Sequence, residues 1–302
     1  MKSRVLGLSA ITFLVFGLVV SSSAQAPQPQ PGQPGVRGGG RGGARPANAR
    51  KRVLAWADTR NGQAQHDFTS HALAVIERLG YESGAYDTFI RTDSNIVTMQ
   101  AKKTTGEPAS GGPSLANVDA IFFLGHRDVP IDETQKADLL AFVRDQGKGF
   151  VAAHTALTAF EPWTEFGELM GGSYDGHPYG NGPGTVVNEA ADFPATRQFP
   201  PTFAFSDEFY QPKGFSPEKS RVLLRLDLSK MPANDGVHIK GGIWPLAWAK
   251  TYGKGRVFYS SLGHEAGTWD NRDVAQMYFE AIKWALGLTE GDASPRPVRT
   301  NQ

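Results

Sequence analysis

Short, unbroken apolar runs occur in the first half of the chain. Residues 52–57, 118–124 and 149–153 are almost entirely apolar, and their length is typical of strands that are buried on both faces. A further strand is indicated at residues 81–86. Strands of this kind that alternate with amphipathic helices are the pattern of a parallel, doubly wound sheet. The pattern therefore predicts an α/β fold.

Three segments have apolar residues at the spacing of an amphipathic helix. The first covers residues 68–79, and Gly80 stands where a glycine commonly ends a helix. The second opens at Asp132, with a glutamine three positions on, which is the spacing of a capping box. The third opens at Asp270 or Asn271 near the end of the chain. We expect these helices to flank the sheet.

The middle of the chain, residues 160–246, has a different composition. It is rich in glycine, proline and aromatic residues and contains few helical stretches. We expect it to form loops and short strands that are added onto the sheet. After it, residues 245–250 and 256–260 predict two strands that pair through a turn at residues 252–255.

The N-terminal residues predict export. Lys2 and Arg4 precede an apolar run at residues 5–20, and an Ala-Gln-Ala sequence ends at residue 26. A basic start, an apolar core and an A-x-A site are the features of a secretory signal peptide. The alternative is a membrane anchor, but the run is shorter than the roughly 20 residues that a spanning helix needs. We expect residues 1–26 to be cleaved and the mature protein to be periplasmic or secreted, without stable membrane insertion.

The segments on either side of the expected domain lack the apolar residues that folding requires. Residues 27–50 are Pro-rich and then Gly-rich, with a single aliphatic side chain large enough to bury, and they predict a disordered linker. Residues 289–302 predict a disordered tail. The folded domain is therefore expected at residues 51–288, a length that suits one large α/β domain.

Charge and cysteine content exclude several classes of function. The chain carries a net charge of +1, and residues 1–50 hold six basic residues and no acid, which leaves residues 51–302 at −5. Such a body offers no electrostatic attraction for nucleic acid. The chain has no cysteine, which excludes disulfides, a thiol nucleophile and thiolate metal ligands. A bound zinc ion would need nitrogen and oxygen ligands.

Four histidines follow predicted strands. His66 lies in the loop after the first strand, His126 and His154 directly follow two central strands, and His264 follows a late strand. Because the carboxyl ends of parallel strands meet at one edge of a sheet, we expect these side chains to surround one pocket. The alternative for each is a structural, hydrogen-bonded histidine. His238 stands at a turn into a peripheral strand, and we expect it outside the pocket.

Four sequence elements resemble the ThuA-like (trehalose utilisation) family. They are Gly-Phe-Val-Ala-Ala-His at residues 149–154, Gly-Gly-Ser-Tyr-Asp-Gly-His at 171–177, Ser-Asp-Glu-Phe-Tyr at 206–210 and the segment 248–264, and they occur in that family's order. The resemblance covers nearly all of residues 52–288. It implies a flavodoxin-like parallel sheet related to the class I glutamine amidotransferases, and a role in carbohydrate utilisation. The amidotransferases carry a nucleophilic cysteine on a tight turn after a central strand. His154 stands in that place here, so glutamine hydrolysis by a thiol is excluded.

The candidate site combines imidazoles with carboxylates. The catalytic candidates are His66, His154, His264, Asp207 and Glu208. Adjacent acids at a strand end point to opposite sides, so we expect only one of the two to face the site. Histidine beside a carboxylate suits proton transfer at a sugar carbon or hydroxyl. The same set suits zinc or another divalent ion, although no compact histidine pair indicates a metal by its spacing. For substrate binding, the candidates are His126, His177, Tyr210, Trp163 and Trp269.

Two functions remain open from the sequence. The first is an enzyme that acts on a sugar or keto-sugar by acid–base hydrolysis, elimination or isomerisation. The second is a non-catalytic carbohydrate-binding module that uses the same pocket. We expect His154→Ala to abolish turnover and to leave thermal stability nearly unchanged, on the assumption that a pocket histidine contributes little packing.

Overall fold

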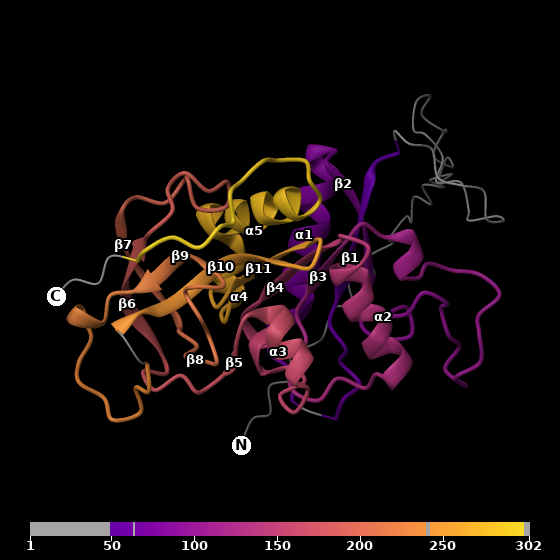
Figure 1. The fold of residues 1–302 in the computed structure, drawn as a ribbon, viewed down its shortest axis with the longest axis horizontal. Coiled ribbons are helices and arrows are strands. Elements are labelled where there is room, and N and C mark those ends of the chain that lie inside the picture. The colour runs from indigo at the N-terminus through magenta and orange to yellow at the C-terminus, as the bar shows by residue number, and fades with distance from the viewer. Residues whose placement is uncertain (1–48, 63, 240–241, 299–302) are drawn as a thin grey trace, which may run out of the picture. The chain divides into compact units, whose positions relative to one another are not determined.

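A nine-stranded sheet forms the centre of the computed structural model, which describes residues 49–62, 64–239 and 242–298 (Figure 1). Its strand order is β2-β1-β3-β4-β11-β10-β9-β6-β7. The parallel strands are β1 (Lys51–Trp56), β2 (Tyr86–Arg91), β3 (Ala120–Phe123), β4 (Gly149–Ala153) and β11 (Gly255–Ser260). When β11 is counted as the fifth parallel strand, their order is two-one-three-four-five, which is that of flavodoxin-like sheets. The predicted fold class is confirmed.

Antiparallel strands extend the sheet beyond β11. They are β10 (Trp244–Tyr252), β9 (Arg221–Leu226), β6 (Asn181–Asn188) and β7 (Thr202–Glu208), and a separate small sheet pairs β5 (Ser173–Tyr174) with β8 (Pro212–Lys213). All of them except β10 come from the middle of the chain, as predicted. β10 pairs with β11 so that Tyr252 lies opposite Gly255, which confirms the predicted strand pair and its turn.

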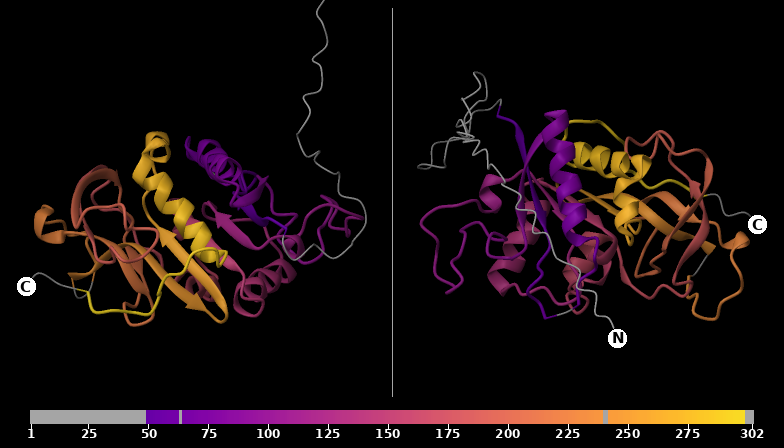
Figure 2. Two further views of the ribbon diagram at one scale, coloured as in Figure 1. Left: turned by 90° about the horizontal axis from the view of Figure 1, so that it is seen from above. Right: turned by 180° about the vertical axis from the view of Figure 1, so that it is seen from behind.

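Helices cover both faces of the parallel strands (Figure 2). One face carries α1 (Thr69–Ser83), α4 (Ala266–Asp270) and α5 (Arg272–Ala285), and the other carries α2 (Glu133–Arg144) and α3 (Thr164–Met170). Side chains of successive strand residues point to opposite faces of the sheet. Val53 packs in the core under α1 and α5, and Leu54 packs in the core under α2 and α3. The short 3-10 helices are η1 (Leu115–Asn117), η2 (His154–Thr158) and η3 (Leu228–Lys230).

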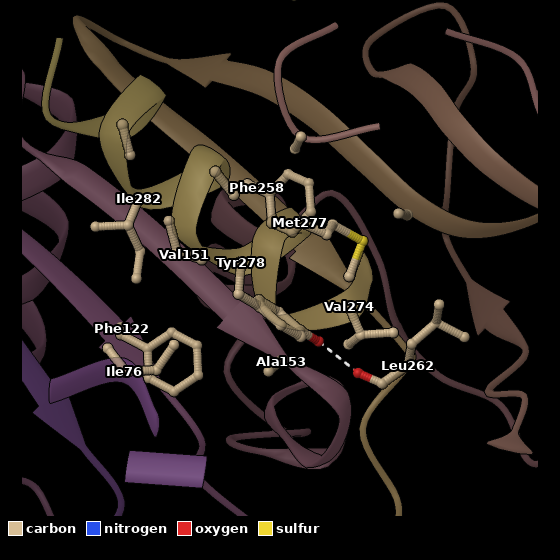
Figure 3. Packing of buried hydrophobic residues seen from close by; sticks show 14 of the residues in the cluster. Ile76, Phe122, Val151, Ala153, Phe258, Leu262, Val274, Met277, Tyr278 and Ile282 are labelled. Atoms are coloured by element: carbon tan, nitrogen blue, oxygen red, sulfur yellow. Dashed lines mark hydrogen bonds between the residues drawn. The ribbon is translucent and has the colours of Figure 1, made fainter. Parts of the chain in front are cut away.

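Two buried aromatic side chains hold the loop after β11. Tyr278 of α5 lies edge-on to Phe122 of the sheet, and its hydroxyl donates a hydrogen bond to the Leu262 carbonyl (Figure 3). Trp269 of α4 stacks on Tyr278 and donates from Nε1 to the Gly263 carbonyl at 3.0 Å. The backbone that leads into His264 is therefore fixed by the hydrophobic core.

The boundary between α1 and β2 differs from the prediction. The helix continues through Gly80 to Ser83 and ends at Gly84, whose φ of 69° suits a glycine. The strand predicted at residues 81–86 is therefore wrong, and β2 begins at Tyr86. Gly80 lacks a side chain for a packing reason, since a Cβ there would lie 2.8 Å from the Tyr86 carbonyl oxygen and closer still to its ring.

The predicted caps of the other two long helices are present. Asp132 accepts a hydrogen bond from the Gln135 backbone N–H, and the Gln135 side chain accepts one from the Asp132 N–H, which closes the capping box of α2. At α5 the cap is Asn271, whose side chain accepts from the backbone N–H groups of Asp273 and Val274. These local signals gave the helix starts correctly.

The structure describes most of the C-terminal segment but little of the N-terminal one. The predicted signal peptide at residues 1–26, and all but the last two residues of the predicted linker, lie outside the described residues. Residues 289–298, part of the tail predicted as disordered, include residues that make contacts with the folded domain. Trp284 donates from Nε1 to the Gly291 carbonyl at 2.9 Å, and the buried Arg221 guanidinium donates to the Asp292 carbonyl. Within the described part of the chain, no helix combines the length and the apolar character needed to cross a membrane.

Candidate active site at the carboxyl edge of the sheet

The four histidines predicted at strand ends lie together at the carboxyl edge of the parallel strands. The His66 ring centroid lies 5.0 Å from that of His126, 5.8 Å from that of His154 and 5.2 Å from that of His264. The antiparallel strands add Glu208, the last residue of β7. Strand β7 is at the far end of the sheet order, yet its end reaches the loop after β11. The site therefore combines the parallel and the antiparallel strands.

His154 occupies a strained turn directly after β4. Its φ is 39°, its side chain is completely buried, and its ring stacks on Tyr210 with centroids 4.2 Å apart. Nδ1 lies 2.6 Å from the Ser261 carbonyl oxygen. Because a carbonyl oxygen only accepts hydrogen bonds, this contact assigns the proton to Nδ1 and leaves Nε2 with a free lone pair when the ring is neutral. That lone pair faces His264 and Glu208.

Glu208 is the carboxylate of the site. One oxygen, Oε2, lies 3.1 Å from His264 Nδ1 and 3.4 Å from His154 Nε2, and the other lies 3.1 Å from His177 Nε2. Burial alone would raise the pKa of Glu208, but the hydrogen bond from His154 and the charges of His264 and His177 outweigh it and lower this pKa to about 2. Glu208 is therefore ionised at neutral pH.

Asp207 has a structural position and does not face the pocket. The carboxylate is fully buried and accepts hydrogen bonds from three backbone N–H groups, those of Gly263, His264 and Glu208, at 2.8, 3.0 and 2.8 Å. Burial raises the pKa of Asp207, although the charge of His154 and these three donors act in the opposite direction. As expected for adjacent acids on a strand, only Glu208 points into the site. Asp207 fixes the backbone that carries His264.

His66 and His126 form the wall on the β1 and β3 side. Burial, together with the charges of His154 and His126, lowers the pKa of His66 to about 4, so this imidazole is neutral at pH 7. Burial and the neighbouring charge of Arg127 also lower the pKa of His126. Nδ1 of His126 is buried without a hydrogen-bond partner. The two rings therefore offer neutral donors and acceptors to a ligand.

These side chains border a pocket of about 820 Å³. The residues that line it are Ala64, Gln65, His66, Asp67, Phe68, His126, Arg127, Thr158, Tyr174, His177, Glu208, Tyr210, His264, Glu265 and Ala266. His154 lies beneath them, buried under the Phe68 and Tyr210 rings. The volume falls within the range of about 300–1,000 Å³ that is typical of small-molecule sites.

Sequence reasoning missed six polar residues of this pocket, which are Gln65, Asp67, Arg127, Thr158, Tyr174 and Glu265. Arg127 adopts a φ of 54°, and its backbone N–H donates to Thr158 Oγ1 at 3.1 Å. The Tyr174 hydroxyl shares a hydrogen bond with His177 Nδ1. Both residues belong to segments that the sequence singled out, since each lies within three positions of a candidate histidine.

Two predicted substrate-binding residues lie elsewhere. Trp163 packs against Phe160 and Phe166 at the start of α3 and borders a different pocket. Trp269 is fully buried in the core, where it supports Gly263 from below. Neither indole lines the pocket that the histidines surround, because each is held by packing against other side chains. His238 lies outside the pocket, as expected, with its exposed ring 3.3 Å from Asp175.

Four side chains of the site also meet the requirements of a metal site. His66, His154, Glu208 and His264 each present one ligand atom, and all four atoms lie within 4.8 Å of one another. Imidazole and carboxylate groups can hold a divalent ion or exchange protons with a substrate. The arrangement has the chemical capacity for both.

Comparison with solved structures shows a common fold. A putative ThuA-like protein from Bacteroides uniformis superposes with a TM-score of 0.62 at 20% sequence identity, over 80% of this chain and 94% of that one. A putative ThuA-like protein from Parabacteroides merdae gives a TM-score of 0.58 at 15% identity, over 83% and 93% of the two chains. At these identities the likeness concerns the fold alone.

Comparison with sequence families gives a match over the whole sheet and its helices. No curated protein sequence gives a significant match. The family model ThuA, described as trehalose utilisation, matches residues 52–285. These residues include every strand from β2 to β11, the α-helices α1 to α5 that the described residues form, and the histidines of the pocket. Since the match extends over most of the sequence, the chain belongs to the ThuA family.

Proposed function

We propose that this protein is an enzyme that acts on a sugar or keto-sugar by histidine and carboxylate acid–base chemistry. One observation carries the proposal: His154, His264 and Glu208 converge beside a sugar-sized pocket with their reactive atoms 3.1–3.4 Å apart. Recognition of a sugar ring requires hydrogen bonds and flat faces, but it does not require three ionisable groups in mutual contact. Family membership, described as trehalose utilisation, adds the carbohydrate class.

His154 is the proposed acceptor of the substrate proton, through His264. The Ser261 carbonyl fixes its Nδ1–H, so Nε2 is available to take a proton. Because His154 is fully buried, His264, which lines the pocket, would take the proton from a substrate carbon or hydroxyl and pass its own Nδ1 proton to Nε2, 3.3 Å away. The ionised Glu208, 3.4 Å from Nε2, would stabilise the imidazolium that forms. In a keto-sugar the carbonyl group acidifies the adjacent C–H bond, which brings proton removal within reach of an imidazole.

The rest of the pocket supplies groups that suit sugar hydroxyls. The guanidinium of Arg127 and the amide of Gln65 offer donors, and the Tyr174 hydroxyl, which is held by His177, offers a further polar group. His264 lies on the far side of Glu208 from His177 and is partly exposed to the pocket. A substrate that contacts these groups would lie over the reactive nitrogen atoms.

The test compares turnover with binding. Trehalose, other disaccharides and their keto derivatives would be incubated with the wild type and with His264→Ala, and the products followed by NMR. The proposal requires new products from the wild type and a loss of at least about 100-fold in the variant. Calorimetric binding without any product would instead support the second candidate, a carbohydrate-binding module that uses the same pocket.

Export is part of the same proposal and rests on the N-terminal sequence alone. A basic start, an apolar run and an Ala-Gln-Ala site support cleavage by signal peptidase. N-terminal sequencing of protein recovered from the periplasm or medium of a bacterial host should give a first residue near Gln25 or Pro27. An intact Met1 on membrane-bound protein would favour an anchor.

A further inference from the structure

We infer that the candidate site binds a divalent transition-metal ion of the zinc class, with His154, His264 and Glu208 as ligands and His66 closing the set. The inference rests on the proposed site and deepens it, because the ion would lie beside the same pocket. With the ion bound, His154 Nε2 would be a ligand and could no longer take a proton. The existence of the metal site is tested without any sugar.

The three closest ligand atoms are separated by the distances expected for three of the four ligand atoms around a tetrahedrally coordinated metal ion. His154 Nε2 and His264 Nδ1 lie 3.3 Å apart, and Glu208 Oε2 lies 3.4 and 3.1 Å from them. Metal–ligand bonds of about 2.0–2.1 Å at tetrahedral angles place neighbouring ligand atoms about 3.3–3.4 Å apart. His66 brings a fourth ligand atom within 4.8 Å of the other three.

Each of the three close ligands is held by a further group, as metal ligands usually are. The Ser261 carbonyl binds His154 Nδ1 at 2.6 Å and so turns the lone pair of Nε2 toward the centre. His177 contacts the second oxygen of Glu208 at 3.1 Å. Asp207 accepts the backbone N–H of His264 at 3.0 Å. The ligand directions are therefore set by the surrounding residues.

The electrostatics of the cluster favour a cation at its centre. When the His154 ring is neutral, its Nε2 and Glu208 Oε2 are both acceptors, only 3.4 Å apart. A proton on His264 Nδ1 can be donated fully to one of them, which leaves the other facing a lone pair. A divalent ion attracts all of the acceptors at once. Three imidazoles with one carboxylate suit zinc, iron, cobalt or nickel better than magnesium or calcium, which prefer oxygen ligands.

The first experiment measures metal binding by the tag-free full chain. After removal of metal with EDTA, the protein would be titrated with CoCl2 by visible absorption and with ZnCl2 by calorimetry. Elemental analysis after gel filtration gives the stoichiometry. We expect about one ion per chain and the visible bands of cobalt with nitrogen and oxygen ligands.

Variants identify the ligands. His264→Ala and Glu208→Gln should each weaken binding by at least about 100-fold, whereas His71→Ala and His238→Ala should not change it. The two control histidines are exposed, and each pairs with an aspartate away from the pocket. Circular dichroism in EDTA checks that each variant folds. If His264→Ala does not fold, Glu208→Gln still tests the site, because glutamine has nearly the same volume as glutamate.

Two outcomes would overturn the inference. One is a wild type that retains no stoichiometric ion and gives no saturable cobalt spectrum. The other is equal cobalt binding by His264→Ala, Glu208→Gln and the two controls. Sugar turnover that persists in EDTA, with no metal bound, would remove the metal and leave the proposed function intact. Stoichiometric metal binding without turnover of any tested sugar would support the metal site and count against the proposed enzymatic function.

Discussion

The imidazole of His154 is held on three sides. Tyr210 stacks on one face, Phe68 lies edge-on at 5.6 Å between ring centroids, and the Ser261 carbonyl accepts from Nδ1. The sequence led us to expect little packing at this residue, but the ring is completely buried. His264, by contrast, keeps 24% of its side chain exposed. The two histidines therefore differ in what their loss does to stability.

Replacement of His154 by alanine should lower both stability and activity. The variant opens a buried cavity and leaves the Ser261 carbonyl without its donor, so we expect the free energy of unfolding to fall by about 2–4 kcal/mol. His264→Ala should cost less than about 1 kcal/mol because its ring is partly solvated. Urea unfolding beside a turnover or metal-binding assay checks both. Equal stability of the two variants would contradict this account of His154.

Asp207→Asn tests the carboxylate beneath the site. The amide oxygen can replace only one of the two carboxylate oxygens, so at least one of the three buried N–H groups loses its acceptor. We expect a loss of about 1–3 kcal/mol in the free energy of unfolding. Asp235→Asn, at an exposed position, is the matched control and should change stability by less than about 0.5 kcal/mol. Similar effects of the two substitutions would count against a supporting role for Asp207.

At the scale of elements, α2 and α5 begin at the capping residues that the sequence predicts, whereas α1 does not end at the glycine predicted to terminate it. The caps of α2 and α5 are the residues that the sequence indicated. In α1, Gly80 lies in the interior because Tyr86 packs against its Cα. Helix α3 contains Gly167, at which an added Cβ meets nothing within 4 Å. Gly80 and Gly167 are therefore both helical, but only at Gly80 would an added Cβ meet neighbouring atoms.

Alanine at the two glycines should have opposite effects. Gly80→Ala should destabilise the protein by about 1–3 kcal/mol, because the Tyr86 ring and carbonyl must move. Gly167→Ala should stabilise it by up to about 1 kcal/mol, because alanine is the better helix former and the space is open. Thermal and urea unfolding of both variants give the signs. Stabilisation by Gly80→Ala would show that the contact with Tyr86 is easily relaxed.

The cap of α2 should depend on pH. The hydrogen bond from Lys102 and that from the Gln135 backbone N–H lower the pKa of Asp132 below its usual value. A carboxyl group whose pKa is lower in the folded state stabilises above its unfolded pKa, and this stabilisation is lost as the pH falls through the folded one. Asp132→Ala should therefore cost about 1 kcal/mol at neutral pH and less in acid. Urea unfolding across the acidic range checks this, and a pH-independent difference would contradict it.

At the scale of the whole molecule, the site depends on the packing of two kinds of strand. The parallel strands supply His66, His126 and His154, and the antiparallel strand β7 supplies Glu208. The tail contacts the antiparallel part of the molecule, at Arg221 in the first position of β9 and at Asp192 in the loop after β6. Arg296 pairs with both Asp192 and Asp292 there.

Truncation after Leu288 tests the contribution of the tail. It removes the carbonyl acceptors of Trp284 Nε1 and of the buried Arg221 guanidinium. We expect the free energy of unfolding to fall by about 2–4 kcal/mol, because two buried donors lose their acceptors. Truncation after Val298, which keeps both carbonyls, is the control. Equal stability of the two chains would support the disordered tail that the sequence predicted.

The sequence by itself determined the fold class and predicted most of the residues that the candidate site brings together. The apolar runs predicted β1, β3, β4 and β11 but misplaced β2, and the carboxyl ends of those four strands located His66, His126, His154 and His264, because topology brings such ends to one edge. It did not decide which of Asp207 and Glu208 faces the pocket. It also assigned Trp163 and Trp269 to substrate, although both are accounted for by packing. Those choices depend on contacts between residues far apart in the chain, such as Asp207 with Gly263, and only the tertiary structure brings such residues together.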